Sequence, residues 1–213
     1  MSALSLPTSR LIGKLSPSTS CFLLCDIQDR FRPLIHNAES VITASNFLCR
    51  VASTLSSPLI ATEQYSKVFG HTVTDVLSQP TPLPPLSPPT FEKKLFSMIT
   101  PEVQSHINSL PTPPQSFILF GIEAHVCVQQ TALDLLAKGY DVHVVVDATS
   151  SQSPLDREVA LERMKGSGAF LTTAQSVAFM LMESAEHECF KTVSKMIVEH
   201  GKVSSYMRAK RGG

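Results

Sequence analysis

Short blocks of consecutive apolar residues recur along the chain, and each block has the length of a β-strand. Most of them lack the alternation of apolar and polar positions that marks a sheet with one solvent-exposed face. They are therefore typical of strands buried on both faces of a parallel sheet. The predicted strands are 21–27, 57–64, 116–122, 141–148 and 169–173.

The stretches between these blocks carry apolar residues at a helical repeat. In 37–55, for example, Val41, Leu48, Val51 and Leu55 fall on one face. Asn37 is the predicted N-cap of that helix. Further helices are predicted at 101–110, 124–138, 155–168, 173–182 and 187–200. This alternation predicts a single α/β domain, in which helices cover both faces of an open parallel sheet of about six strands in a Rossmann-like three-layer arrangement.

Two segments flank the predicted domain, which we place at residues 20–198. The lead-in 1–19 contains Arg10 and Lys14 but no acidic residue, so a mitochondrial targeting segment is an alternative to a simple lead-in. The tail 199–213 is basic and is expected to be disordered. The proline-rich stretch 80–89 is interpreted as a surface loop rather than a domain boundary, because strands and helices resume beyond it.

Composition excludes several classes of protein. Lys+Arg and Asp+Glu both number 18, so the formal net charge is zero and the basic excess typical of nucleic-acid binding is missing. No apolar run approaches the roughly 20 residues that span a bilayer, so no membrane partner is expected. The five cysteines are widely spaced and form no CxxC, which argues against a disulfide framework or a zinc site and favours a reducing, cytoplasmic compartment.

Three chemically useful side chains are predicted to meet at one edge of the sheet, because ligands bind at the carboxyl ends of parallel strands. Asp26 ends the first strand, Lys93 or Lys94 follows the proline-rich loop, and Cys127 begins the helix after strand 116–122. A helix N-terminus and a nearby ammonium both favour the nucleophilic thiolate, and a carboxylate can move its proton. Each residue taken alone has an ordinary structural role as the alternative.

Motifs in the same order and spacing make the chain resemble the isochorismatase-like cysteine hydrolases, most closely the isochorismatase domain-containing branch. The motifs are CDIQDRFRPLI, ATEQY, KKLFSM, GIEAHVCVQQTALDLLAKGYDVHVVVDA and MKGSGAF. The resemblance implies a catalytic triad of Asp26, Lys93 and Cys127. It favours Lys93 over Lys94 because the lysine of the family stands three residues before the phenylalanine of this motif, here Phe96.

The resemblance also implies how the backbone contributes. A cis peptide would join Ile122 to Glu123 and would aim the Glu123 and Cys127 N–H groups at a substrate oxygen. The candidate pocket residues, for each of which plain packing is the alternative, are Gln28, Phe31, Thr62, Gln64 and Phe96.

The segment TEQYSKVFGHTV departs from the metal-binding pattern of the related nicotinamidases. Glu63 and His71 remain as candidate ligands, but the first histidine of that pattern is missing, so neither a metal nor another cofactor is expected. The resemblance implies cleavage of a small amide-like C–N substrate through a thioester, and assembly into a homo-oligomer. A catalytically retired binding or scaffold protein of the same fold is the alternative, and a nuclease or RNA-associated role is a weaker one.

Overall fold

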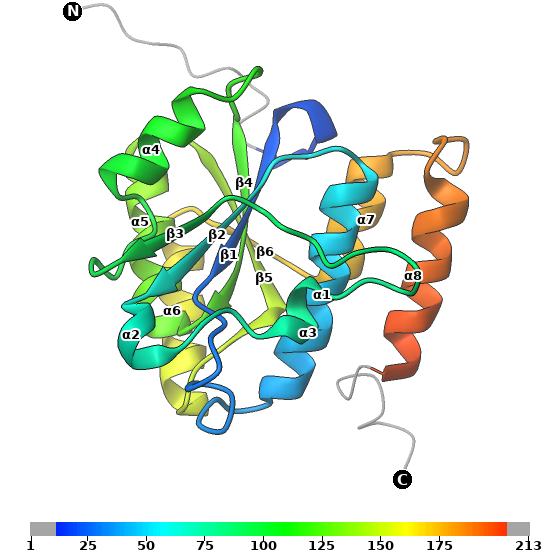
Figure 1. Ribbon diagram of the computed structural model, residues 1–213. Helices are drawn as coiled ribbons and strands as arrows, with labels where there is room; N and C mark the ends of the chain where they lie inside the picture. The colour runs from blue at the N-terminus through cyan, green and yellow to red at the C-terminus, as the bar shows by residue number, and fades with distance from the viewer. Residues whose placement is uncertain (1–11, 204–213) are drawn as a thin grey trace, which may run out of the picture.

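A single parallel sheet forms the centre of the computed structural model, which describes residues 12–203 (Figure 1). The strand order is β3-β2-β1-β4-β5-β6, and every neighbouring pair is parallel. The strands are β1 (Ser20–Cys25), β2 (Leu59–Gln64), β3 (Thr90–Lys93), β4 (Ser116–Ile122), β5 (Asp141–Ser150) and β6 (Phe170–Thr172). The order reverses between β1 and β4, which is where a fold of this kind binds its ligand.

Helices cover both faces of the sheet, so the predicted fold class is confirmed. The longer helices on one face are α1 (Ala38–Thr54), α7 (Ala174–Met182) and α8 (Phe190–Val203), and those on the other are α4 (Pro101–Asn108), α5 (Gln129–Ala137) and α6 (Pro154–Gly166). The short helical segments are η2 (Pro17–Thr19), α2 (Ser66–Phe69), α3 (Thr74–Leu77) and the π-helical turn η3 (Ala124–Val128).

The alternation of side chains along β1 supplies both hydrophobic cores. Phe22 and Leu24 pack in the core beneath α1 and α7, whereas Cys21, Leu23 and Cys25 pack in the core beneath α5 and α6. All five are fully buried. The continuous apolar run in the sequence therefore reflects a strand covered by helices on both sides.

Local details differ from the sequence prediction at two helix starts. Asn37 is the N-cap residue of α1, but its backbone is left-handed (φ 56°) rather than extended and its side chain makes no capping bond; it contacts His36 instead. The predicted helix 124–138 is divided into η3 and α5, and it ends before Gly139, whose φ of 83° is one that glycine adopts readily.

The sequence predicts a lead-in segment before the domain and a disordered tail after it. Residues 1–11 of the lead-in and 204–213 of the tail lie outside the described residues, and so do the targeting and disorder predictions made for them. Helix α8 continues to Val203, so the first residues of the predicted tail are helical. Within 12–203, no helix combines the length and the apolar character that crossing a membrane requires.

Candidate active site

The carboxyl ends of β1, β3 and β4 bring the predicted triad together, with β2 between β3 and β1 in the sheet. Asp26 follows β1, Lys93 ends β3, and Cys127 lies in η3 after β4. Gly121 allows the close approach of β4 to β1 at this point. Its φ is 126°, and a Cβ atom there would lie 2.1 Å from the carbonyl oxygen of Cys25.

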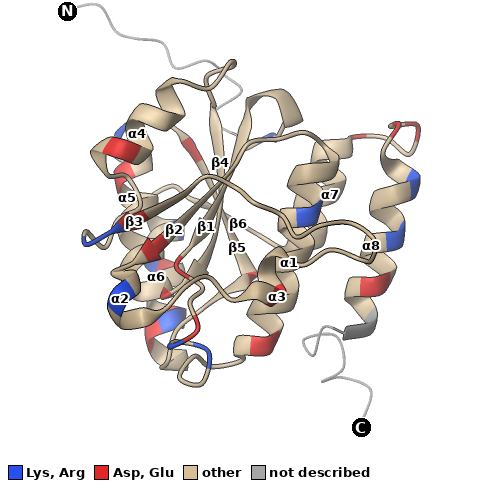
Figure 2. Cartoon of the chain, viewed as in Figure 1, with Lys and Arg blue, Asp and Glu red and all other residues tan. Residues whose placement is uncertain are grey.

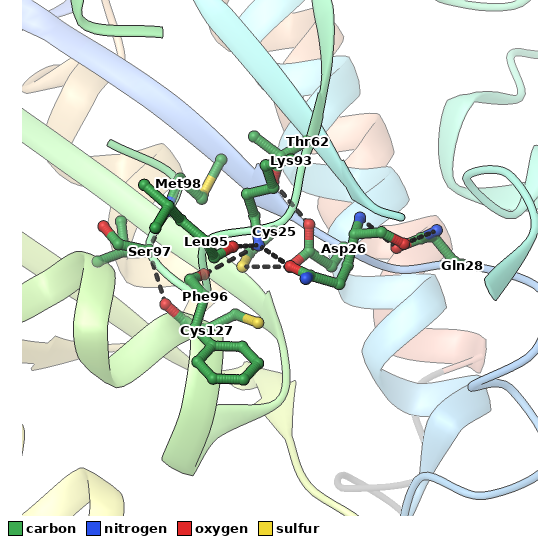
Figure 3. A network of polar contacts seen from close by, with 12 residues as sticks. Cys25, Asp26, Gln28, Thr62, Lys93, Leu95, Phe96, Ser97, Met98 and Cys127 are labelled. Atoms are coloured by element: carbon green, nitrogen blue, oxygen red, sulfur yellow. Dashed lines mark hydrogen bonds and ion pairs between the residues drawn. The ribbon is translucent and has the colours of Figure 1, made fainter. Parts of the chain in front are cut away.

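Asp26 and Lys93 form a buried ion pair. The Lys93 Nζ atom lies 2.7 Å from Asp26 Oδ2, and the two side chains are 0% and 1% exposed. The other carboxylate oxygen, Oδ1, accepts a hydrogen bond of 2.7 Å from the Thr62 hydroxyl (Figure 3). Both oxygens of the buried carboxylate therefore have a polar partner, which is what burial of a charge requires.

The Lys93 ammonium is surrounded by oxygen atoms. Besides Asp26, its Nζ donates to Gln64 Oε1 at 2.7 Å, to the Leu95 carbonyl at 3.1 Å and to the Phe96 carbonyl at 2.9 Å (Figure 3). An ammonium has three protons, so these four acceptors use all of its donor capacity. The loop after β3 thus folds back over its own lysine and fixes the position of the charge.

The charge of Lys93 is retained in spite of its burial. Burial alone lowers the pKa of Lys93, but the negative charge available on Cys25, Asp26 and Cys127 outweighs that effect, and the net result is a raised pKa. Lys93 is therefore a cation at neutral pH, placed beside two thiols and a carboxylate.

Cys127 completes the cluster. Its side chain is buried, and its Sγ atom, Cys25 Sγ and an Asp26 carboxylate oxygen all lie within 4.8 Å of one another. Thr131 holds this segment in place: its hydroxyl donates to the Cys127 carbonyl at 2.6 Å and accepts from the Met98 N–H at 2.9 Å. The loop after β3 and the helix after β4 are thereby joined next to the thiol.

Cys25 is a neighbour that the sequence interpretation treated only as part of a strand. Burial, a hydrogen bond with Cys127 and the charge of Asp26 raise the pKa of Cys25 well above its usual value. Its Sγ lies 3.6 Å from Asp26 Oδ2. Its position directly before Asp26 in an apolar run gave no sign of chemistry, because the contact with Cys127 arises from the pairing of β1 with β4.

Within residues 12–203, the group that could hold a metal ion consists of these same three residues, Cys25, Asp26 and Cys127. A divalent cation there would compete with the Lys93 ammonium for the Asp26 carboxylate. Glu63 and His71, the two candidate ligands from the sequence, lie together away from these three residues. The His71 Nδ1 atom is 3.0 Å from Glu63 Oε2.

A cavity of about 310 Å³ opens over the cluster. Its lining consists of Asp26, Phe31, Gln64, Phe69, Phe96, Ile122, Glu123, Val126 and Cys127. The predicted pocket residues Phe31, Gln64 and Phe96 thus line the cavity, whereas Gln28 and Thr62 lie outside its lining.

Gln28 and Thr62 form hydrogen bonds that hold residues of the site in place. The Gln28 amide donates to the carbonyls of Gln64 and Gly70, and its oxygen accepts from the Gln64 N–H.

Phe69, which sequence reasoning did not single out, reaches the cavity by stacking on Phe31 with ring centroids 4.7 Å apart. Phe31 lies in the loop after β1 and Phe69 ends α2, and no spacing in the sequence links them.

The backbone turn into η3 has the geometry that the resemblance implied. The Ile122–Glu123 peptide is cis, and Glu123 and Cys127 both line the cavity. The Glu123 carbonyl accepts from the N–H groups of Val126 and Val128. The use of the Glu123 and Cys127 N–H groups as an oxyanion hole stays a prediction.

Comparison with known proteins agrees with this geometry. The isochorismatase domain model matches residues 20–176. The secreted isochorismatase effector Isc1 of Phytophthora sojae is 43% identical over 205 residues, which cover 96% of each chain. Isochorismatase domain-containing protein 2 of Xenopus laevis is 42% identical over 203 residues, 95% of each chain. Among solved structures, MAR1 ribonuclease from Caenorhabditis elegans is 40% identical with a TM-score of 0.79, covering 87% of this chain and 92% of its own. The chain therefore belongs to the isochorismatase-like hydrolase family.

Proposed function

We propose that this protein hydrolyses an amide-like C–N bond of a small molecule, with Cys127 as the nucleophile. The observation that carries the proposal is that the Cys127 thiol shares one cavity with a carboxylate whose counter-ion, Lys93, is fully buried. A thiol, an ionised carboxylate and a fixed positive charge are the parts that covalent acyl transfer requires. The family membership of the chain is consistent with hydrolysis.

In the proposed reaction the Asp26 carboxylate takes the proton of the Cys127 thiol as sulfur attacks the carbonyl carbon. The Glu123 and Cys127 N–H groups hold the resulting oxyanion. Asp26 then gives the proton to the leaving amine as the C–N bond breaks, which leaves a thioester on Cys127. Water, deprotonated by Asp26, attacks the thioester, and the acid leaves as the thiol regains its proton.

Lys93 acts in this scheme through charge and position. All its protons are directed at oxygen atoms of the protein, so it transfers none to the substrate. Its positive charge stabilises the Cys127 thiolate and pairs with the Asp26 carboxylate.

The test is a screen of small amides, anilides and esters with the wild-type protein and the Cys127→Ala variant. We expect hydrolysis by the wild type, and a thioester visible as an added acyl mass on the peptide that contains Cys127. Cys127→Ala should lower turnover by a factor on the order of 10³ or more. Cys189→Ala, which removes a half-buried thiol hydrogen-bonded to the Thr54 carbonyl, is the control and should keep most activity. Full turnover by Cys127→Ala would overturn the covalent mechanism.

Cleavage of RNA is a second candidate, because a relative 40% identical to this chain is named a ribonuclease. Along the ribbon drawn in Figure 2, positions with lysine or arginine are interspersed with positions that carry acidic residues. Filter binding of RNA at low and physiological salt, followed by incubation with labelled RNA, tests this candidate. RNA affinity that falls steeply with salt, together with cleavage, would favour it over amide hydrolysis.

Two further predictions remain open to measurement. A retired scaffold has no need of an activated thiol, so a Cys127 no more reactive than the other buried cysteines would favour that alternative. The homo-oligomer also stays a prediction, which light scattering of the full chain would test.

A further inference from the structure

The lining of the cavity carries negative but no positive side chains. Asp26 and Glu123 are its charged members, and none of the lining residues is lysine or arginine. Lys93 lies behind the lining with a side chain that is 0% exposed, and its charge is already paired with Asp26. A ligand that enters this cavity therefore meets no cationic side chain.

Glu123 makes the cavity unfavourable to anions. Its carboxylate accepts hydrogen bonds from the N–H and the side-chain amide of Gln152, at 2.9 and 3.2 Å. Both donors are uncharged, and in the part of the chain that the structure describes no ion pair involves Glu123. Neither donor supplies a positive charge, so a second carboxylate that enters the cavity finds no cationic partner beside Glu123.

The walls of the cavity suit a flat apolar group. Phe31 and Phe69 are stacked with an interplanar angle of 18°, and Phe96, Ile122 and Val126 complete the apolar surface. Aromatic faces bind other flat groups by stacking or by edge contact. The volume of about 310 Å³ lies at the small end of ligand pockets, so the group must be small.

We infer that the site selects small, flat, uncharged amides and rejects substrates that carry a carboxylate. The inference rests on the proposed function and deepens it by naming the substrate class. The reacting carbonyl lies over Cys127, the flat substituent lies against the apolar wall that the phenylalanines form, and Glu123 excludes anionic competitors.

A matched pair of alkylating reagents tests the charge selection without requiring turnover. Iodoacetamide and iodoacetate both form a carbon–sulfur bond with a thiolate and release iodide, and they differ in charge. The rate ratio of the two reagents at Cys127, resolved by mass spectrometry, is compared with the ratio for 2-mercaptoethanol. We expect Cys127 to favour iodoacetamide by about tenfold more than the free thiol does.

Substitution of the acidic side chain checks the cause. Glu123→Gln removes the charge and keeps the backbone N–H, so the preference for iodoacetamide should shrink towards that of the free thiol. The matched control is Glu162→Gln, an exposed position on α6, and it should leave the preference unchanged.

Protection experiments test the shape. Benzamide should slow the alkylation of Cys127 by iodoacetamide, benzoate should protect at least tenfold less well at equal concentration, and Phe69→Ala should weaken protection by benzamide. Equal protection by benzoate, or a preference of Cys127 for iodoacetate, would overturn the inference while leaving a reactive thiol and the proposed hydrolysis intact. A Cys127 that reacts with neither reagent faster than Cys25 would overturn the proposed function and the inference together.

Discussion

A buried ion pair and an exposed network of two ion pairs in this molecule have nearly the same N–O distances and opposite surroundings. Lys93 and Asp26 meet at 2.7 Å with side chains 0% and 1% exposed. Arg32 meets both Glu39 and Asp75 at 2.8 Å on the surface, and these three side chains are 38%, 71% and 56% exposed. The distances are alike, so any difference in their energetic effects must come from the solvent.

Burial changes what the loss of one partner means. If one member of an exposed pair is removed, water solvates the other, and the loss is small. If one member of a buried pair is removed, a charge is left without compensation in a medium that solvates it poorly. The structure supports the buried pair with Thr62, Gln64 and backbone carbonyls, which together supply the contacts that water would otherwise provide.

The largest effect is expected from Lys93→Met, which breaks the buried pair. We expect the free energy of unfolding, measured in urea at pH 7, to fall by about 3–5 kcal/mol, because Asp26 is left as an uncompensated buried charge. Cys127 should also react more slowly with iodoacetamide in the variant.

The adjacent lysine provides a matched control for this variant. Lys94 is exposed, and its ammonium lies 5.1 Å from the centre of the Tyr65 ring. Lys94→Met should change stability by less than about 1 kcal/mol. The reverse order of the two effects would show that Lys94, not Lys93, holds the site together.

A buried titratable group without a partner sharpens the comparison. His143 in β5 stacks on Phe170, and neither of its ring nitrogens has a hydrogen-bond partner among the described residues. Burial lowers the pKa of His143 to about 4, from an ordinary value of 6.5. Between pH 4 and pH 6.5 the histidine is protonated in the unfolded chain but neutral in the folded chain. The contribution of the neutral histidine to stability is therefore complete above pH 6.5 and is lost as the pH falls towards 4.

The corresponding prediction is that acidification from pH 7 to pH 4 lowers stability by about 3 kcal/mol through this one group. In His143→Leu the curve of unfolding free energy against pH should be flatter by that amount, whereas His36→Gln, at an exposed histidine, should leave its shape unchanged. Equal slopes in wild type and His143→Leu would contradict the assignment.

A smaller effect is expected from Thr62→Val, which keeps the ion pair and removes one of its supports. The hydroxyl bond to Asp26 Oδ1 is charge-assisted, so its loss should cost about 2 kcal/mol of stability. Thr62→Ser retains the hydroxyl and should recover most of that loss. If Thr62→Ser destabilises the protein more than Thr62→Val does, methyl packing rather than the hydrogen bond matters at this position.

The sequence was informative wherever the signal is local. Buried strands leave continuous apolar runs, and the ends of such runs located Asp26 and Cys127 at the sheet edge without any coordinates. The choice between Lys93 and Lys94 depended on family resemblance. In the structure Lys93 is the one buried against Asp26, whereas Lys94 points to solvent.

The sequence was uninformative where the feature depends on register or on loop packing. The contact of Cys25 with Cys127 requires β1 to pair with β4, and the place of Phe69 in the cavity requires α2 to pack against the loop that carries Phe31. Gln28 was a candidate pocket residue, but its amide holds the backbone of Gln64 and Gly70. Such roles depend on which hydrogen-bond partners the tertiary fold supplies.

The smallest effect is expected from the exposed network. Arg32→Met should lower stability by about 1 kcal/mol or less at low salt, because water replaces the lost partner of Glu39 and Asp75. In 1 M salt, where the screening length is about 3 Å, the loss should approach zero, whereas the loss caused by Lys93→Met should persist because salt does not reach a buried pair. Urea unfolding of both variants at 0.05 M and 1 M salt (about 14 Å and 3 Å of screening length) separates the two cases. If Arg32→Met proved as costly as Lys93→Met, or if salt weakened both losses equally, ion-pair length rather than burial would govern the stability of this fold.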